Sequence, residues 1–193
     1  MLRRLELDAA APDRLAAQCL AHGIEFVSTP FDSESAELLV RRVGVKRLKV
    51  SSGDLTNGPL LLRLAASGLP VILSTGMATL DEVAEALGAL AFGYLAAGKL
   101  PPSRDAFARS LGSEAGRAAL AARVTLLHCT TAYPTAFADV NLRAMDTLAE
   151  TFGLPVGYAD HTTGITVAIA ATAHGARVIE KHFTLSQIGR AHV

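Results

Sequence analysis

Two histidines near the end of the chain stand in similar local sequences. His161 directly follows Asp160 in residues 157–162 (GYADHT), and His182 comes 21 positions later (182 minus 161), two residues after Glu180. Each histidine ends a short run typical of a β-strand. Because the carboxyl ends of neighbouring parallel strands meet at one face, we expect the two imidazoles to reach a single metal ion.

Composition narrows the class of protein. The 193 residues are half apolar, carry no net formal charge, and contain 5% aromatic residues and no Trp. This length suffices for one substantial core, and the charge balance predicts neither a nucleic-acid nor an anionic-membrane partner. Cys19 and Cys129 make no disulfide framework, and no apolar run approaches about 18 residues. We therefore expect a cytoplasmic protein.

Strand-like and helix-like segments alternate along the chain. Strands are predicted at 25–29, 47–50, 71–75, 124–129, 156–158 and 177–183, and helices at 33–43, 59–67, 79–90, 141–152 and 166–174. This alternation is typical of α/β folds with a parallel sheet, either an open doubly wound sheet or a (β/α)₈ TIM barrel. No Gly-x-Gly-x-x-Gly motif supports a dinucleotide fold, and polar residues crowd the predicted strand ends. Together these features favour the barrel.

One connection, residues 94–123, breaks the alternation. Its Pro101-Pro102-Ser103 segment predicts the start of an additional helical stretch. We expect this connection to be an insertion on the helix side of the sheet.

Six motifs, in order, resemble the sialic acid synthases, the N-acetylneuraminate synthase family that includes legionaminate and pseudaminate synthases. They are FVSTPFD (26–32), KVSSGD (49–54), LSTGM (73–77), LHCTTAYP (127–134), GYADHT (157–162) and EKHFT (180–184). The resemblance implies a TIM barrel. It also implies a metal-dependent transferase that condenses phosphoenolpyruvate with N-acetylmannosamine or a related N-acetylated sugar and releases phosphate.

The resemblance further implies that the chain is incomplete. Family members begin with two strands that have no counterpart before Ile24, and they continue well beyond Leu185 into a further small domain. We therefore expect residues 1–185 to form a partial TIM-barrel synthase domain. Residues 186–193 do not resemble the family, and we interpret them as an assembly artefact without a function.

The resemblance also assigns the metal. His161 and His182 become its ligands, with Mn²⁺ expected and Mg²⁺ or Co²⁺ as alternatives, and the open coordination positions serve substrate and water. Without the motifs, two histidines that hold no metal are an equally good interpretation.

Two carboxylates are the candidate catalytic groups, Glu180 and Asp54. Glu180 shares the rim with His182 by the two-residue alternation of a strand, although a salt bridge with Lys49 or Lys181 is an alternative role. Asp54 stands where the family usually has Glu, so its reach toward substrate is one methylene shorter.

Six residues resemble the phosphoenolpyruvate contacts of the family: Lys49, Ser52, Ser74, Thr131, Tyr133 and Thr29. A strand-end lysine offers a point charge, and Ser52 offers a hydroxyl beside a glycine amide. The alternative is that these are a snorkelling lysine and simple helix caps. Thr131 replaces the usual Asn or Ser, and Ala159 replaces a Ser, which removes a contact worth about 1 kcal/mol.

Other functions stay open at this level. The chain could be another aldolase-type barrel that uses phosphoenolpyruvate or a sugar phosphate, or an inactive fragment. The resemblance implies a homodimer for the whole protein. Cys129, His128, His174 and His22 are expected to be structural.

Overall fold

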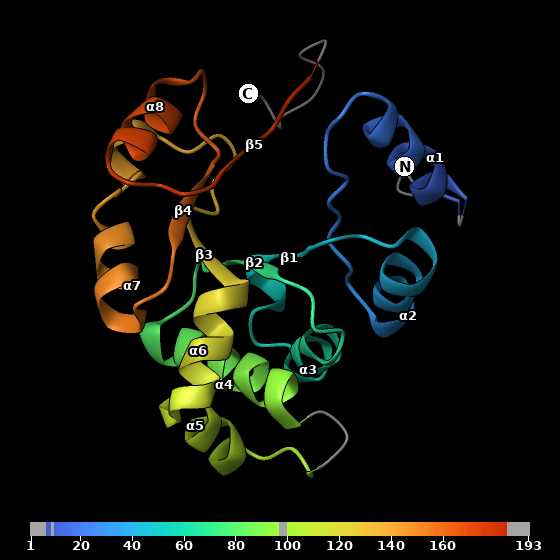
Figure 1. The fold of residues 1–193 in the computed structure, drawn as a ribbon. Coiled ribbons are helices and arrows are strands. Elements are labelled where there is room, and N and C mark those ends of the chain that lie inside the picture. The colour runs from blue at the N-terminus through green and yellow to red at the C-terminus, as the bar shows by residue number, and fades with distance from the viewer. Residues whose placement is uncertain (1–6, 9, 97–99, 185–193) are drawn as a thin grey trace.

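The computed structural model describes residues 7, 8, 10–96 and 100–184, and a five-stranded parallel sheet runs through it (Figure 1). The order in the sheet is the order in the chain: β1 (Leu48–Val50), β2 (Val71–Ser74), β3 (Val124–Cys129), β4 (Val156–Asp160) and β5 (Ile179–Lys181). A doubly wound sheet reverses its strand order at a switch point, whereas a barrel does not. The predicted barrel class is therefore confirmed, and the chain forms a curled half-barrel.

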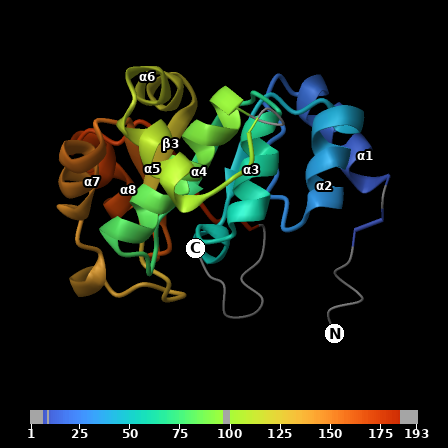
Figure 2. The same cartoon turned by 90° about the horizontal axis from the view of Figure 1, so that it is seen from below.

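The helices that follow β1 connect the strands and cover the outer side of the sheet, whereas α1 and α2 precede β1, as Figure 1 and the turned view in Figure 2 show. They are α1 (Ala11–Ala21), α2 (Ser33–Glu37), α3 (Gly58–Ala66), α4 (Leu80–Ala96), α5 (Arg104–Gly112), α6 (Glu114–Arg123), α7 (Ala144–Phe152) and α8 (Thr166–Ala173). Short 3₁₀ turns lie at Ser52–Asp54 and Phe137–Asp139. No helix within the described ranges combines the length and apolar character needed to cross a membrane.

The two faces of the sheet have different cores. The outer face packs against the helices in one large apolar cluster, to which the strands contribute Leu48, Val50, Val71, Leu73, Val124, Leu126, Val156 and Tyr158. The inner face carries a small cluster of Leu127, Cys129 and Ala159, with Ile72 and Val178 against it. Side chains alternate between the two faces along a strand. The division of the core therefore also predicts which face the residues just after each strand will point to.

Segment 25–29 was predicted as a strand, and this is wrong. It is extended but joins β1 through the Lys49 N–H, which donates to the Ser28 carbonyl at 3.2 Å. That single bond does not form a ladder. The predicted helix at 33–43 also differs, because it changes at Leu38 from α2 to a π-helix, Leu38–Val43, that ends at Gly44 with φ of 73°.

The connection between β2 and β3 confirms the predicted insertion. Helix α4 continues to Ala96 instead of ending near 90, and Ser103 caps α5 by accepting from the Ala106 N–H at 3.1 Å. Phe92 of α4 meets Phe107 of α5 edge to face, with 5.4 Å between ring centroids. The insertion therefore packs on the helix layer, away from the strand ends.

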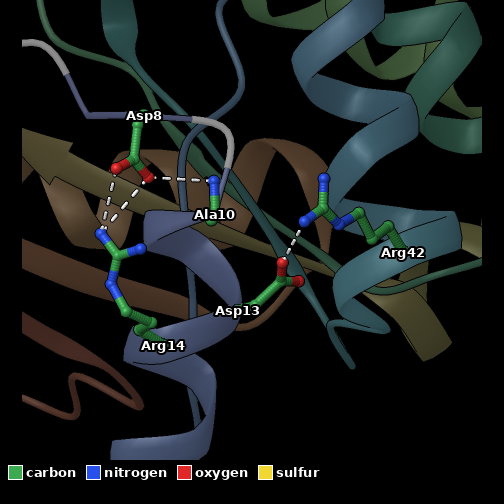
Figure 3. A network of polar contacts seen from close by, with 5 residues as sticks. All are labelled: Asp8, Ala10, Asp13, Arg14 and Arg42. Atoms are coloured by element: carbon green, nitrogen blue, oxygen red, sulfur yellow. Dashed lines mark hydrogen bonds and ion pairs between the residues drawn. The ribbon is translucent and has the colours of Figure 1, made fainter.

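Helix α1 was not predicted from the sequence, and exposed charges attach it to the rest of the molecule (Figure 3). Arg14 pairs with Asp8 at 3.3 Å, and Asp13 pairs with Arg42 of the π-helix at 2.5 Å. All four side chains are more than a third exposed, so water and salt screen both pairs.

Candidate active site

His161 and His182 meet at the carboxyl ends of β4 and β5, where the strand-end argument placed them. Their ring centroids are 5.5 Å apart. His161 Nδ1 lies 2.6 Å from the Thr130 carbonyl oxygen. Since a carbonyl only accepts, Nδ1 carries a proton, and in the neutral imidazole Nε2 keeps the lone pair.

Tyr133 lies over both histidines. Its ring centroid is 4.2 Å from that of His161 and 5.9 Å from that of His182. Burial raises the pKa of the Tyr133 phenol, and the neighbouring Cys129 and Glu180 raise it further. The phenol is therefore a neutral hydrogen-bond donor at the edge of the histidine pair.

A second cluster joins β1, β2 and β5 on the inner face. Lys49 is buried, and its Nζ donates to Ser74 Oγ at 2.8 Å and to the Val50 carbonyl at 3.0 Å. Glu180 Oε2 lies 3.4 Å from the same Nζ, with the Glu180 side chain 45% exposed. The salt-bridge alternative for Glu180 is thus present, with Lys49 as the partner.

Ser52 and Thr131 flank this cluster. The Ser52 hydroxyl lies 3.3 Å from Cys129 Sγ, which links the ends of β1 and β3. A Cβ atom at Gly76 would stand 2.7 Å from Cys129 Sγ and 3.0 Å from a Thr131 methyl. The glycine therefore lets the segment after β2 lie close to the residues at the end of β3. Cys129 is buried, as expected of a structural thiol.

Two predicted site residues stand apart. Asp54 Oδ1 accepts from Asn57 Nδ2 at 3.3 Å, beside the N-cap of α3. Within the described residues, no hydrogen bond or ion pair joins Asp54 to Lys49 or to the histidines. Thr29 follows Ser28 in the extended segment beside β1, and no contact places it in the cluster. The structure brings the other predicted residues to the inner face.

Sequence reasoning missed a polar group behind the histidines. Asp160 is fully buried and pairs with Lys181 at 2.8 Å. Burial raises the pKa of Asp160, but hydrogen bonds from Lys181 and Thr162 outweigh it and hold that pKa below its usual range. Strand alternation places both residues on the face opposite the histidines, a signal that could have found them.

The residues fit a divalent metal with few protein ligands. His161 offers a free Nε2 while a carbonyl orients its ring, the usual arrangement behind a metal-bound imidazole. His182 is exposed and adjacent. No group of three or more His, Cys, Asp or Glu side chains suited to a metal occurs within residues 7, 8, 10–96 and 100–184. Any metal there would take its remaining ligands from water or substrate.

The chain thus forms a parallel α/β half-barrel with a histidine pair at its strand ends and a buried lysine on its inner face. The chain belongs to the NeuB family, whose model matches residues 1–191. It is 44% identical to N,N'-diacetyllegionaminic acid synthase of Campylobacter jejuni, over 97% of this chain and 48% of the relative. The corresponding protein of Legionella pneumophila is 43% identical over 97% of this chain and 46% of that relative.

Solved structures agree with this assignment. The fold is similar to N-acetylneuraminic acid synthetase of Leptospira borgpetersenii, with a TM-score of 0.73 and 33% identity over 94% of this chain and 54% of that one. The chain thus spans about half the length of the relatives it matches. The relatives named above are sialic-acid-type sugar synthases.

Proposed function

We propose that this protein supplies the strand-end site of a sialic-acid-type synthase, which condenses phosphoenolpyruvate with an N-acetylated sugar and releases phosphate. The observation that carries the proposal is the pairing of His161 and His182, 5.5 Å apart, on the same rim as Lys49. The free cysteines fit a reducing cytoplasm. The homodimer expected of the whole protein belongs to the same proposal.

The proposed metal, Mn²⁺ with Mg²⁺ or Co²⁺ as alternatives, would be held by His161 and His182. When bound, it supplies Lewis-acid polarisation of the sugar aldehyde. His161 is already oriented for this task, since its Nδ1 is engaged and Nε2 is free. Tyr133 covers the ring and shields that side from water.

Lys49 and its neighbours would bind the anionic substrate. A buried ammonium that donates to Ser74 is a fixed positive charge for a carboxylate or phosphate. Ser52, which now contacts a thiol, can redirect its hydroxyl toward a phosphate oxygen. Thr131 and Thr29 belong to the same proposed pocket, Thr131 through its place beside Gly76. Glu180 loses its lysine partner when the substrate anion arrives.

C3 of phosphoenolpyruvate forms a bond to the sugar aldehyde carbon, and the cationic centre left at C2 takes a water oxygen. Glu180, half exposed beside Lys49, is placed to accept the water proton at Oε2. The C2–O bond to phosphate breaks as the C2 hydroxyl becomes a ketone and passes its proton to the leaving phosphate, and the former aldehyde oxygen takes up the proton removed from water. Asp54, committed to the α3 cap, takes no defined step here.

Phosphate release tests the proposal. We expect the whole protein to release phosphate from phosphoenolpyruvate only with an N-acetylated sugar and Mn²⁺. The acceptors should include N-acetylmannosamine and a doubly N-acetylated sugar, because the two relatives compared above are diacetyllegionaminic acid synthases. Full activity after chelation would overturn the metal role.

Isotope labelling separates the rival mechanism. C–O cleavage places solvent ¹⁸O in the product, whereas an aldolase using a lysine Schiff base would be trapped by borohydride. Borohydride trapping of a Schiff base at Lys49 would replace the proposed mechanism. Absence of both turnover and trapping in the folded chain would identify it as an inactive fragment.

A further inference from the structure

Asp160 and Lys181 form an ion pair on the sheet face opposite the histidines. Lys181 Nζ lies 2.8 Å from Asp160 Oδ2, with the side chains 16% and 0% exposed. The two residues are direct partners in the register of β4 and β5. The pair therefore closes the carboxyl end of these two strands.

Further hydrogen bonds extend the pair across the turn that carries His161. Lys181 Nζ donates to the Thr162 carbonyl at 2.9 Å. Asp160 Oδ1 accepts from the Thr162 N–H at 2.9 Å and from its hydroxyl at 2.7 Å. The residues on both sides of His161 are thus fixed to each other and to β5.

The bonds have a consequence for the opposite face. Successive side chains of a strand point to opposite faces, so holding residues 160 and 181 on the helix-covered face turns residues 161 and 182 inward. Gly157 allows the close strand approach this needs, because a Cβ there would stand 2.2 Å from the Val178 carbonyl oxygen. With that register, the two imidazoles become neighbours.

We propose that Asp160 and Lys181 are positioning residues whose ion pair sets the separation and orientation of His161 and His182. The metal-binding readout of this proposal rests on the proposed function. The geometric statement about the two rings does not. Neither residue touches substrate in this view, so both act through the histidines.

The test compares variants of the chain with Mn²⁺ alone as the probe, counted by the electron paramagnetic resonance of the free ion. The double variant Asp160→Asn/Lys181→Met removes both charges without leaving a buried charge unpaired, which preserves the fold. We expect it to weaken Mn²⁺ binding by about 10- to 100-fold, as for other residues that orient metal ligands. The single variant Lys181→Arg, which keeps the cation beside Asp160, should keep most of the Mn²⁺ affinity of the wild type.

Val167→Ala is the matched control. Val167 is buried in α8 against the same sheet but makes no polar contact with the pair. This variant should lower thermal stability while Mn²⁺ affinity stays close to wild type. An equal loss of affinity in Val167→Ala would show general loosening and overturn the positioning role. Wild-type affinity in the double variant would overturn it as well.

A second readout needs no metal. In chain labelled with ¹³C-histidine, we expect a nuclear Overhauser effect between the ring protons of His161 and His182, lost in the double variant. Persistence of this effect in the double variant, or its absence in the wild type, would refute the proposal. A wild-type chain that shows the effect but binds no Mn²⁺ would contradict the proposed function. The positioning role would then be decided by comparing the nuclear Overhauser effect in the wild type and in the double variant.

Discussion

The two faces of the sheet differ in what they hold. The outer face is a continuous apolar core of leucines, valines and alanines under the helices, while the inner face has a small apolar cluster below a rim of Lys49, Ser74, Glu180 and the histidines. Adjacent residues of one strand therefore serve different purposes. Stability resides mainly on one face and the proposed chemistry on the other.

Asp160 and Lys181 are the exception that joins the two faces. They are charged residues on the helix-covered side, fully or largely buried, yet each precedes a histidine of the inner rim. Changes on either face should thus separate stability from binding, and changes at this pair should affect both.

The largest expected effect is on the inner face. His161→Ala should abolish saturable Mn²⁺ binding while changing the metal-free free energy of unfolding by only about 1 kcal/mol, the value of its bond to Thr130. Calorimetric titration with Mn²⁺ measures the first quantity and urea unfolding the second. His174→Ala, which removes the His174 pair with Asp146 at 3.0 Å between α7 and α8, is the control and should bind normally. Binding retained in His161→Ala would break the division between the faces.

Removing one charge of the buried pair should have the largest effect on stability. Lys181→Met leaves Asp160 as an uncompensated buried carboxylate, which lowers the free energy of unfolding by about 3–5 kcal/mol. Urea unfolding followed by circular dichroism measures this. Asp160→Asn/Lys181→Met should recover most of the loss, and an equal loss in both variants would argue against desolvated charge as the cause.

Two neighbouring leucines sharpen the comparison of the faces. Leu126 lies in the outer core and Leu127 in the inner cluster, and both are fully buried. Leu126→Ala should lower stability by about 2–5 kcal/mol, with Leu127→Ala toward the lower end of that range because fewer side chains surround the cavity. Both are measured by urea unfolding. A larger loss at Leu127 would mean that the inner face carries more of the stability than its small cluster indicates.

The smallest effect is expected at the N-terminal helix. Arg42→Ala removes an exposed pair with Asp13 and should lower stability by about 1 kcal/mol or less. In about 1 M NaCl, where the Debye length falls to about 3 Å, the difference from wild type should disappear. Thermal unfolding at two salt concentrations measures it, and a loss that is insensitive to salt would point to packing by the arginine stem instead.

The sequence predicted those features that depend on local pattern. The strand at 124–129 and the helix after 166 agree with the structure because their apolar runs and boundaries are local signals. The meeting of His161 and His182 followed from parallel strand ends alone. The strand predicted at 25–29 was wrong because a β-type composition does not by itself supply a hydrogen-bonded neighbouring strand. Only one hydrogen bond to β1 forms.

What the sequence could not supply was register. Asp160 and Lys181 are 21 positions apart (181 minus 160), and nothing local indicates that they are cross-strand partners. The same holds for Lys49, Ser74 and Glu180, which come together only once three strands are aligned. Helix α1 was also missed, and its Leu15 and Leu20 side chains are 44% and 81% exposed.

The pairing of Asp160 with Lys181 in the β4–β5 register means that an error in strand alignment changes which side chains reach each face of the sheet. A slip of β5 by one residue would exchange the faces of its side chains, turning His182 toward the helices and Lys181 toward the inner rim. An ion that binds only the histidine pair would bind only correctly aligned chains. It would stabilise them relative to misaligned chains by a free energy of RT ln(1 + [L]/Kd). If the proposed metal binds there, its supply during synthesis would influence how many chains reach the aligned state, before any turnover takes place.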